Sequence, residues 1–264
     1  MAWINKIFRV RDFFVLILGV IVMQTLACLL INRFMFYPVK GGYDQSLDGY
    51  VSIETNGENV AARVLGPWRG RRAILFCHGN AEDLTSLDGR FDGLVAEGVT
   101  VATFDYPGYG LSDGSPSEAG CYRNCHALYD WMIHTRGFAP EDIFVVGFSI
   151  GSGIAVELAA TRDVGGLWLE APYLSAPRVV TRMRLLAIDP FPNVGRIGNV
   201  HCPVVVMHGT RDSVIPFSQG RQLFEAAPAP KRFIAVDGAG HEDLITSYGV
   251  KQYERELREF LSKK

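Results

Sequence analysis

The sequence predicts an α/β domain with a mostly parallel, twisted sheet and helices on both faces. Short β-branched apolar runs alternate with longer stretches of helical periodicity, and a hairpin signal at Asn56-Gly57 precedes them. Each later apolar run ends in a polar or glycine-rich loop. Ligands of such sheets bind at the carboxyl ends of the strands, so we expect the functional residues in those loops.

The N-terminal part of the chain predicts a membrane anchor. A basic segment, 1–12, precedes a nearly unbroken apolar stretch, 13–31, which is long enough to cross a bilayer. A signal peptide cleaved after Ala27 is the alternative, but residues 29–31 continue the apolar run and favour an uncleaved transmembrane helix. Basic residues are more numerous before the span than after it, which predicts a single-pass protein with a cytoplasmic N-terminus and its domain on the opposite side.

We interpret residues 32–49 as a linker and residues 50–262 as the domain. Two strands at 50–55 and 60–65 form the hairpin. Further strands are expected at 73–77, 100–104, 143–146, 167–169, 204–207 and 233–236, and helices at 84–98, 117–136, from 150 onward and at 244–261.

A short insert, 174–200, departs from the alternation and is placed to cap the site. It predicts an amphipathic helix at 176–188, ended by Asp189-Pro190-Phe191-Pro192. The insert is basic, which indicates either a solvated outer face or a surface for anionic lipid headgroups or acidic substrates. Its charged residues are Arg178, Arg182, Arg184, Arg196 and Asp189.

Composition excludes several classes of function. The net charge of −2, without a basic stripe, argues against nucleic acid as a partner. The five cysteines are an odd number without a disulfide spacing, so buried free thiols are expected. Cys121, Cys125 and His126 have no second ligand cluster, so we predict neither a metal nor a cofactor. The oligomeric state stays open.

The run Gly147-Phe148-Ser149-Ile150-Gly151 follows an apolar strand and precedes a helical segment, as in a nucleophile elbow. A tight strand-to-helix turn leaves no room for a Cβ atom at Gly147 or Gly151, and it lifts the Ser149 hydroxyl clear of the sheet. The alternative is a glycine-rich turn with an ordinary serine.

A serine hydroxyl needs a base, and the base needs an acid to orient it and stabilise its charged form. Ser149, Asp212 and His241 each lie in a loop that follows a predicted strand, and they occur in the expected order. Glu170, one strand before Asp212, is the alternative acid. We also expect His78 and His208 to pack and to form hydrogen bonds.

The oxyanion of an acyl-transfer intermediate needs two N–H donors held in place. The Ile150 N–H, directly after the nucleophile, is one candidate. The second is expected from the loop after the first parallel strand, where Asn80 is favoured and Ala81 is the alternative.

Four motifs together resemble the α/β-hydrolase superfamily, and within it the BEM46 and ABHD13/ABHD17 group. They are His78-Gly79-Asn80-Ala81, Asp105-Tyr106-Pro107-Gly108-Tyr109-Gly110-Leu111-Ser112, the elbow and Gly240-His241. The resemblance spans residues 50–261 and implies an α/β-hydrolase fold with Ser149, Asp212 and His241 as its triad. It also implies a serine hydrolase of esters or thioesters, often at membranes. The depalmitoylase members have a cysteine-rich N-terminus, where this chain has an apolar span.

Two other functions fit the same residues. One is a serine peptidase of similar fold, although the basic insert offers few acidic groups for a substrate ammonium. The other is a non-catalytic binding protein on a hydrolase fold. Such a protein would not need Ser149, Asp212 and His241 together, so their presence argues against it.

Overall fold

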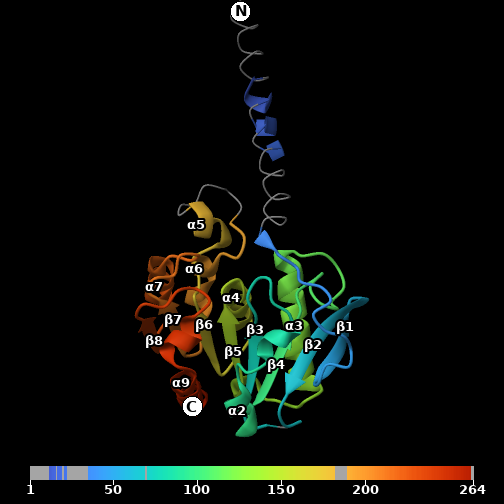
Figure 1. The fold of residues 1–264 in the computed structure, drawn as a ribbon. Helices are drawn as coiled ribbons and strands as arrows, with labels where there is room; N and C mark the ends of the chain where they lie inside the picture. The colour runs from blue at the N-terminus through green and yellow to red at the C-terminus, as the bar shows by residue number, and fades with distance from the viewer. Residues whose placement is uncertain are drawn as a thin grey trace, which may run out of the picture.

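The structure, a computed structural model, describes residues 12–15, 17–19, 21–22, 35–68, 70–181 and 189–262. Its centre is an eight-stranded sheet in the order β1-β2-β4-β3-β5-β6-β7-β8 (Figure 1). The strands are β1 Tyr50–Thr55, β2 Glu58–Leu65, β3 Ala73–Cys77, β4 Thr100–Phe104, β5 Ile143–Phe148, β6 Gly166–Glu170, β7 Val204–Gly209 and β8 Lys231–Val236. The pairs β1–β2 and β2–β4 are antiparallel and the rest are parallel, so the sheet is mostly parallel, as predicted.

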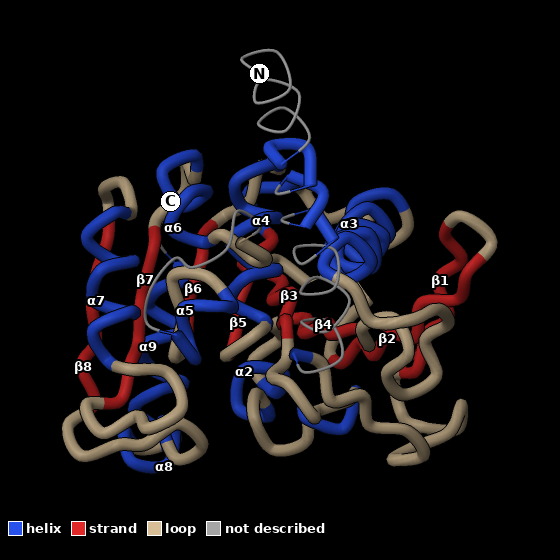
Figure 2. The backbone as a smooth tube through the Cα atoms, turned by 90° about the horizontal axis from the view of Figure 1, so that it is seen from above, coloured by secondary structure: helices blue, strands red, loops and turns tan. Residues whose placement is uncertain are grey.

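The central strands β3 to β7 are buried along their whole length. A strand covered on both faces needs apolar side chains at successive positions, and these runs supply them. Helices cover both faces of the sheet (Figure 2), and an apolar cluster lies on each face. The first contains buried residues of α3 Glu118–His134, α4 Gly151–Thr161 and α7 Phe217–Ala226, and the second contains those of α2 Asp92–Ala96 and α9 Val250–Ser262.

Two predicted helices are interrupted. The prediction of one helix at 84–98 is wrong, because η1 Leu84–Leu87 ends before Gly89, where φ is +72°, and α2 starts afresh. The C-terminal helix is likewise divided into α8 Leu244–Tyr248 and α9 at Gly249, where φ is +93°. A left-handed residue cannot continue a right-handed helix, so each glycine ends one.

The insert 174–200 begins with α5 Ala176–Thr181, the first part of the predicted helix. Residues 182–188, the rest of that prediction, lie outside the described residues. The chain is non-helical at 189–192, as the prolines predict, and then forms α6 Asn193–Arg196 and η3 Ile197–Asn199. The remaining short turn, η2 Pro140–Asp142, leads into β5.

In the described part of the chain, no helix has both the length and the apolar composition needed to cross a bilayer. Of the predicted span 13–31, only residues 13–15, 17–19, 21 and 22 are described, so most of that prediction, with the Ala27 cleavage site, lies outside the described residues. The described residues of this stretch are helical. Their large apolar side chains are exposed, as at Phe14, which is 64% accessible.

The cysteines that the structure describes are free and buried, as expected: Cys77, Cys121, Cys125 and Cys202. Burial raises the pKa of the Cys121 and Cys125 thiols far above their usual value. These thiols therefore stay protonated and contribute to packing.

Candidate active site

The turn after β5 has the geometry of a nucleophile elbow. Ser149 lies in the left-handed region with φ +52°, and its N–H donates to the Glu170 carbonyl on the neighbouring strand at 3.0 Å. A Cβ atom on Gly151 would come within 2.1 Å of the Cys77 carbonyl oxygen, and one on Gly147 within 2.7 Å of the Ala155 Cβ. The two glycines therefore let α4 pack closely against β3 and β5 while Ser149 stays at the tip of the turn.

The structure brings together Ser149, His241 and Asp212. His241 Nε2 lies 3.0 Å from Ser149 Oγ, and His241 Nδ1 lies 2.7 Å from Asp212 Oδ2. The three residues follow β5, β8 and β7, so loops at the carboxyl ends of these strands supply them at one edge of the sheet. His241 is only 7% exposed and its ring lies 5.2 Å from that of Phe148, which limits its movement.

Asp212 is held as a carboxylate. Its Oδ1 accepts the Val214 N–H at 2.9 Å and the Ile215 N–H at 2.8 Å. Burial by itself would raise the pKa of Asp212, but hydrogen bonds from His208 and His241 outweigh burial and hold that pKa well below its usual range. A charged Asp212 favours the His241 tautomer with the proton on Nδ1 and leaves Nε2 as the acceptor toward Ser149.

His208 is a contact of the acid that the sequence did not reveal in full. Its buried Nε2 lies 2.9 Å from the Ile215 carbonyl oxygen and 3.3 Å from Asp212 Oδ2. The prediction that His208 forms hydrogen bonds is correct, and its ring contacts both the Ile215 carbonyl oxygen and the predicted acid. The available signal was the spacing, since His208 lies near the end of β7, four residues before Asp212.

Glu170, the alternative acid, lies in a different environment. Its carboxylate accepts the Tyr253 hydroxyl at 2.5 Å and pairs with Arg90. The side chain is fully buried, and in the described residues no hydrogen bond joins it to His241. Glu170 therefore forms its ion pair with Arg90 and does not contact the His241 imidazole in the described residues.

The predicted oxyanion donors lie at the same edge of the sheet. Ile150 caps α4, and Asn80 and Ala81 belong to the loop after β3. Ala81 adopts the left-handed conformation with φ +58°. In the described part of the chain, the backbone N–H groups of Ile150, Asn80 and Ala81 donate no hydrogen bond, which leaves them available to an incoming oxygen.

A buried contact between His78 and Asp105 supports the loop at 78–81. His78 Nε2 is 3.6 Å from Asp105 Oδ1, and both side chains are inaccessible. His78 Nδ1 lies 2.8 Å from the Gly79 carbonyl oxygen, and the His78 ring stacks on Tyr106. Burial alone would lower the pKa of His78, but the hydrogen bond and charge of Asp105 outweigh burial and raise it. The pair braces the loop from below, in keeping with the packing role predicted for His78.

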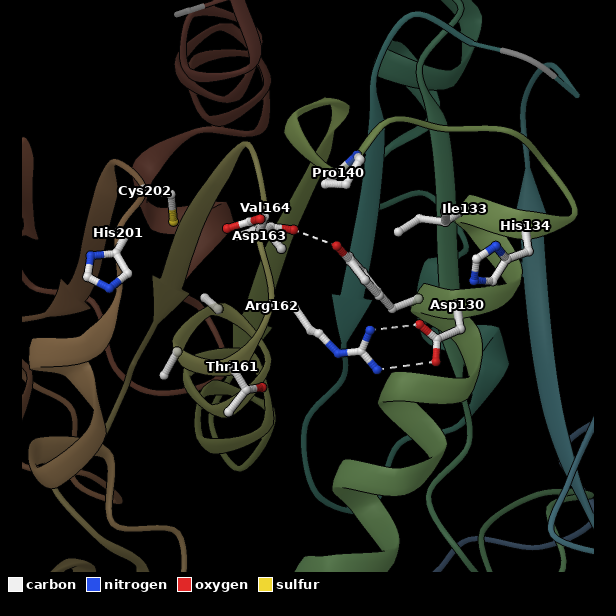
Figure 3. Close-up of a pocket in the computed structure, with 13 residues that line it drawn as sticks. Asp130, Ile133, His134, Pro140, Thr161, Arg162, Asp163, Val164, His201 and Cys202 are labelled. Carbon is white, nitrogen blue, oxygen red and sulfur yellow. Dashed lines mark hydrogen bonds and ion pairs between the residues drawn. The ribbon is translucent and has the colours of Figure 1, made fainter.

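A cavity of about 480 Å³ lies elsewhere (Figure 3). It is lined by the carboxyl-terminal ends of α3 and α4 and by the residues that lead into β5, β6 and β7. Arg162 and Asp130 form an ion pair at its wall. The cavity therefore lies at the amino end of the sheet, opposite Ser149. In the described residues no cluster of three or more His, Cys, Asp or Glu side chains is arranged to hold a metal ion.

The fold, with a serine, an imidazole and a carboxylate aligned at the carboxyl edge of the sheet, is that of an α/β-hydrolase. Residues 74–200 match the model of the Alpha/beta hydrolase family. Alpha/beta hydrolase domain-containing protein 17B of Homo sapiens is 36% identical over 192 residues, and protein 17C of Mus musculus is 37% identical over 196 residues. The chain belongs to the α/β-hydrolase family and to the group that these relatives represent.

The alignments leave part of each relative unmatched. They cover 72% and 73% of this chain, but 66% and 60% of proteins 17B and 17C. The chain therefore spans no more than about two thirds of the length of these curated relatives.

Solved structures agree on the fold. An esterase from Pyrococcus furiosus superimposes with a TM-score of 0.68 at 18% identity, over 86% of this chain and 97% of its own. The esterase RhEst1 from Rhodococcus sp. ECU1013 superimposes with a TM-score of 0.64 at 19% identity, over 81% and 99%. At this level of identity the likeness extends to the fold alone.

Proposed function

We propose that this chain is a membrane-anchored serine hydrolase that cleaves carboxylic esters or thioesters through an acyl-enzyme on Ser149. The observation that carries the proposal is the continuous line of contacts from Ser149 Oγ through the His241 ring to Asp212. A serine, a base and an orienting acid in this arrangement are the requirements for activating a hydroxyl as a nucleophile.

In the acylation step, Ser149 Oγ attacks the carbonyl carbon of the substrate while His241 Nε2 accepts the hydroxyl proton. The carbonyl oxygen becomes an oxyanion, and Asp212 stabilises the imidazolium without taking its proton. When the intermediate collapses, His241 returns the proton to the leaving alcohol or thiol. The acyl group remains on Ser149.

In the deacylation step, His241 accepts a proton from water, and the resulting hydroxide attacks the acyl carbon. The bond to Ser149 Oγ breaks, the proton returns to Oγ, and the carboxylic acid leaves. Both steps use the same base. The low pKa of Asp212 supports its role, because the acid must stay charged throughout.

The Ile150 N–H, together with the Asn80 or Ala81 N–H, is proposed to hold the oxyanion. In the described part of the chain these N–H groups donate no hydrogen bond, and Ile150 caps α4, whose positive dipole end faces the reaction zone. Removal of one such donor typically raises the barrier by about 2.7–4 kcal/mol.

We further propose that the stretch 13–31 anchors the enzyme as a single-pass membrane protein with a cytoplasmic N-terminus. The apolar run and the exposed side chains of Phe13, Phe14 and Leu18 support a lipid environment. The cap gives less support to a lipid-binding surface, since Arg178 pairs with Asp189 and Arg196 with Glu118. Protease protection of the domain in sealed vesicles tests the orientation, and digestion without detergent contradicts it.

The test of the chemistry is labelling of the full-length chain in membranes with a fluorophosphonate. We expect labelling of the wild type and none of Ser149→Ala, with Ser218→Ala, at an exposed serine on α7, as the control. Equal labelling of Ser149→Ala contradicts the assignment of the nucleophile.

Substrate comparison then separates the remaining functions. Hydrolysis of 4-nitrophenyl and thioester substrates, but not of amino-acyl amides, supports the proposal. Faster cleavage of the amides favours a peptidase. Absence of labelling and of turnover in folded wild-type protein favours a binding protein.

A further inference from the structure

The chain between the predicted membrane span and β1 lies along the active-site loops. We call residues 35–43 the strap. The Tyr37 N–H donates to Asn80 Oδ1 at 3.0 Å and to the Tyr109 hydroxyl at 2.9 Å. Both acceptors belong to loops at the carboxyl edge of the sheet, so the strap crosses the edge at which Ser149 lies.

The side-chain amide of Asn80 takes part in this contact through both its oxygen and its nitrogen. Asn80 Nδ2 donates to the Met35 carbonyl oxygen at 2.6 Å, and Oδ1 also accepts the Tyr109 hydroxyl at 2.7 Å. Donors and acceptors on both sides of the amide fix its orientation. Asn80 is thus held by the strap through its side chain, while its backbone N–H donates no hydrogen bond to any residue that the structure describes.

The rest of the strap is attached equally firmly. The Gly110 N–H donates to the Val39 carbonyl oxygen at 2.7 Å, and the Tyr43 hydroxyl accepts the Leu111 N–H at 3.1 Å and donates to the buried Asp105. Phe36 is 4% exposed and meets the Phe191 ring of the cap edge-on, with the ring centroids 6.1 Å apart. The strap therefore joins the loops after β3 and β4 to the insert 174–200.

We propose that the strap is part of the catalytic apparatus and that Asn80 and Tyr109 are positioning residues through which it fixes the backbone of residues 80–81. The inference rests on the proposed function, because it assigns a task to the same oxyanion loop. Preorganised donors must be held where charge develops. The Tyr37 N–H and the Tyr109 hydroxyl both donate to Asn80 Oδ1, and these hydrogen bonds attach the loop to the strap.

The first test compares Tyr37→Pro with Tyr37→Ala in the full chain, using 4-nitrophenyl butyrate. Both variants lose the same side chain, which is 59% exposed, but only proline removes the N–H donor. Misplacement of catalytic groups by about 1 Å can cost on the order of 100-fold in rate, so we expect kcat of Tyr37→Pro to be at least about tenfold below that of Tyr37→Ala.

Two further readouts separate positioning from general damage. KM and the apparent pKa of the kcat/KM profile should match between the two variants, because His241 and Asp212 are untouched. Equal far-ultraviolet circular dichroism checks that both are folded. A kcat of Tyr37→Pro within about twofold of Tyr37→Ala, in folded protein, overturns the proposal.

The second test removes the other partner. Tyr109→Phe deletes the hydroxyl that joins the Tyr37 N–H to Asn80 Oδ1 and keeps the buried ring. Tyr37→Pro and Tyr109→Phe break one contact, so their combined loss of kcat should be clearly smaller than the product of the separate losses. Full multiplicativity contradicts a shared role. Wild type that is never labelled at Ser149 contradicts the proposed function instead, whereas active wild type that tolerates both changes contradicts only this inference.

Discussion

Asp212 contacts two imidazoles with one oxygen. Its Oδ2 lies 2.7 Å from His241 Nδ1 and 3.3 Å from His208 Nε2, while Oδ1 accepts two backbone N–H groups. Each of these four groups can donate a hydrogen bond to the carboxylate. Together they hold Asp212 in position and favour its charged form. His208 is buried, and its contact with the candidate triad is the one with Asp212. We therefore assign it the task of holding the acid in place.

Asp212→Asn should lower kcat by about 10⁴-fold, the loss typical of a triad whose acid becomes an amide. An amide can donate to His241 Nδ1 and thereby place the imidazole proton on the wrong nitrogen. The measurement is the steady-state rate on 4-nitrophenyl butyrate, with circular dichroism as a check of folding. A loss below about tenfold would remove Asp212 from the proposed mechanism.

The same carboxylate makes stability depend on pH. The pKa of Asp212 in the folded state is depressed below its ordinary value of 3.8. Its contribution is therefore complete above that value and is lost as pH falls toward the folded-state pKa. The difference in thermal midpoint between wild type and Asp212→Asn should be constant from pH 5 to 7 and shrink below about pH 4. A difference that grows on acidification contradicts this account.

Glu170→Gln should affect stability much more than chemistry. The change removes the counter-charge of Arg90, whose side chain is only 16% exposed, and breaking a buried ion pair in this way typically costs about 3–5 kcal/mol. The Glu170 carbonyl that accepts the Ser149 N–H is retained. Chemical denaturation should show the loss, while folded protein keeps its fluorophosphonate labelling rate within about fivefold. Labelling abolished in folded Glu170→Gln would instead identify Glu170 as the acid.

Gly151→Ala should prevent proper folding. Its Cβ would collide with the Cys77 carbonyl, a backbone atom in the centre of the sheet that cannot move aside. We expect a loss of more than about 3 kcal/mol, beyond ordinary overpacking. Gly198→Ala is the matched control, since nothing lies within 4 Å of its added Cβ. Equal thermal midpoints for the two variants would mean that the elbow has room to relax.

The sequence predicted the strands best. All eight were located, because a buried parallel strand requires a run of apolar residues and the hairpin requires its turn. The helical pattern at 84–98 was misleading, since periodicity continues across Gly89 while the backbone does not. Local composition does not reveal whether a glycine has positive φ until the packing around it is known.

The sequence predicted that Ser149, His241 and Asp212 lie together, but it did not reveal the contacts that hold the neighbouring loops. Ser149, His241 and Asp212 occur in recognisable loops, whereas the contacts of Tyr37 with Asn80 and Tyr109 join residues 43 and 72 positions apart. No sequence periodicity encodes such pairs. The membrane span at 13–31 and its orientation stay predictions.

The strap and α9 reach the sheet from opposite edges. Residues 35–43 lie on the loops that follow the strands, whereas Leu261 accepts a hydrogen bond from Arg72, just before β3 (Figure 1). A reporter domain fused after residue 262 would stand on the side remote from Ser149, and immobilisation through that end would leave the carboxyl ends of the strands free. An affinity tag inserted just ahead of Met35 would instead lie close to Asn80 and the loops that carry the candidate site.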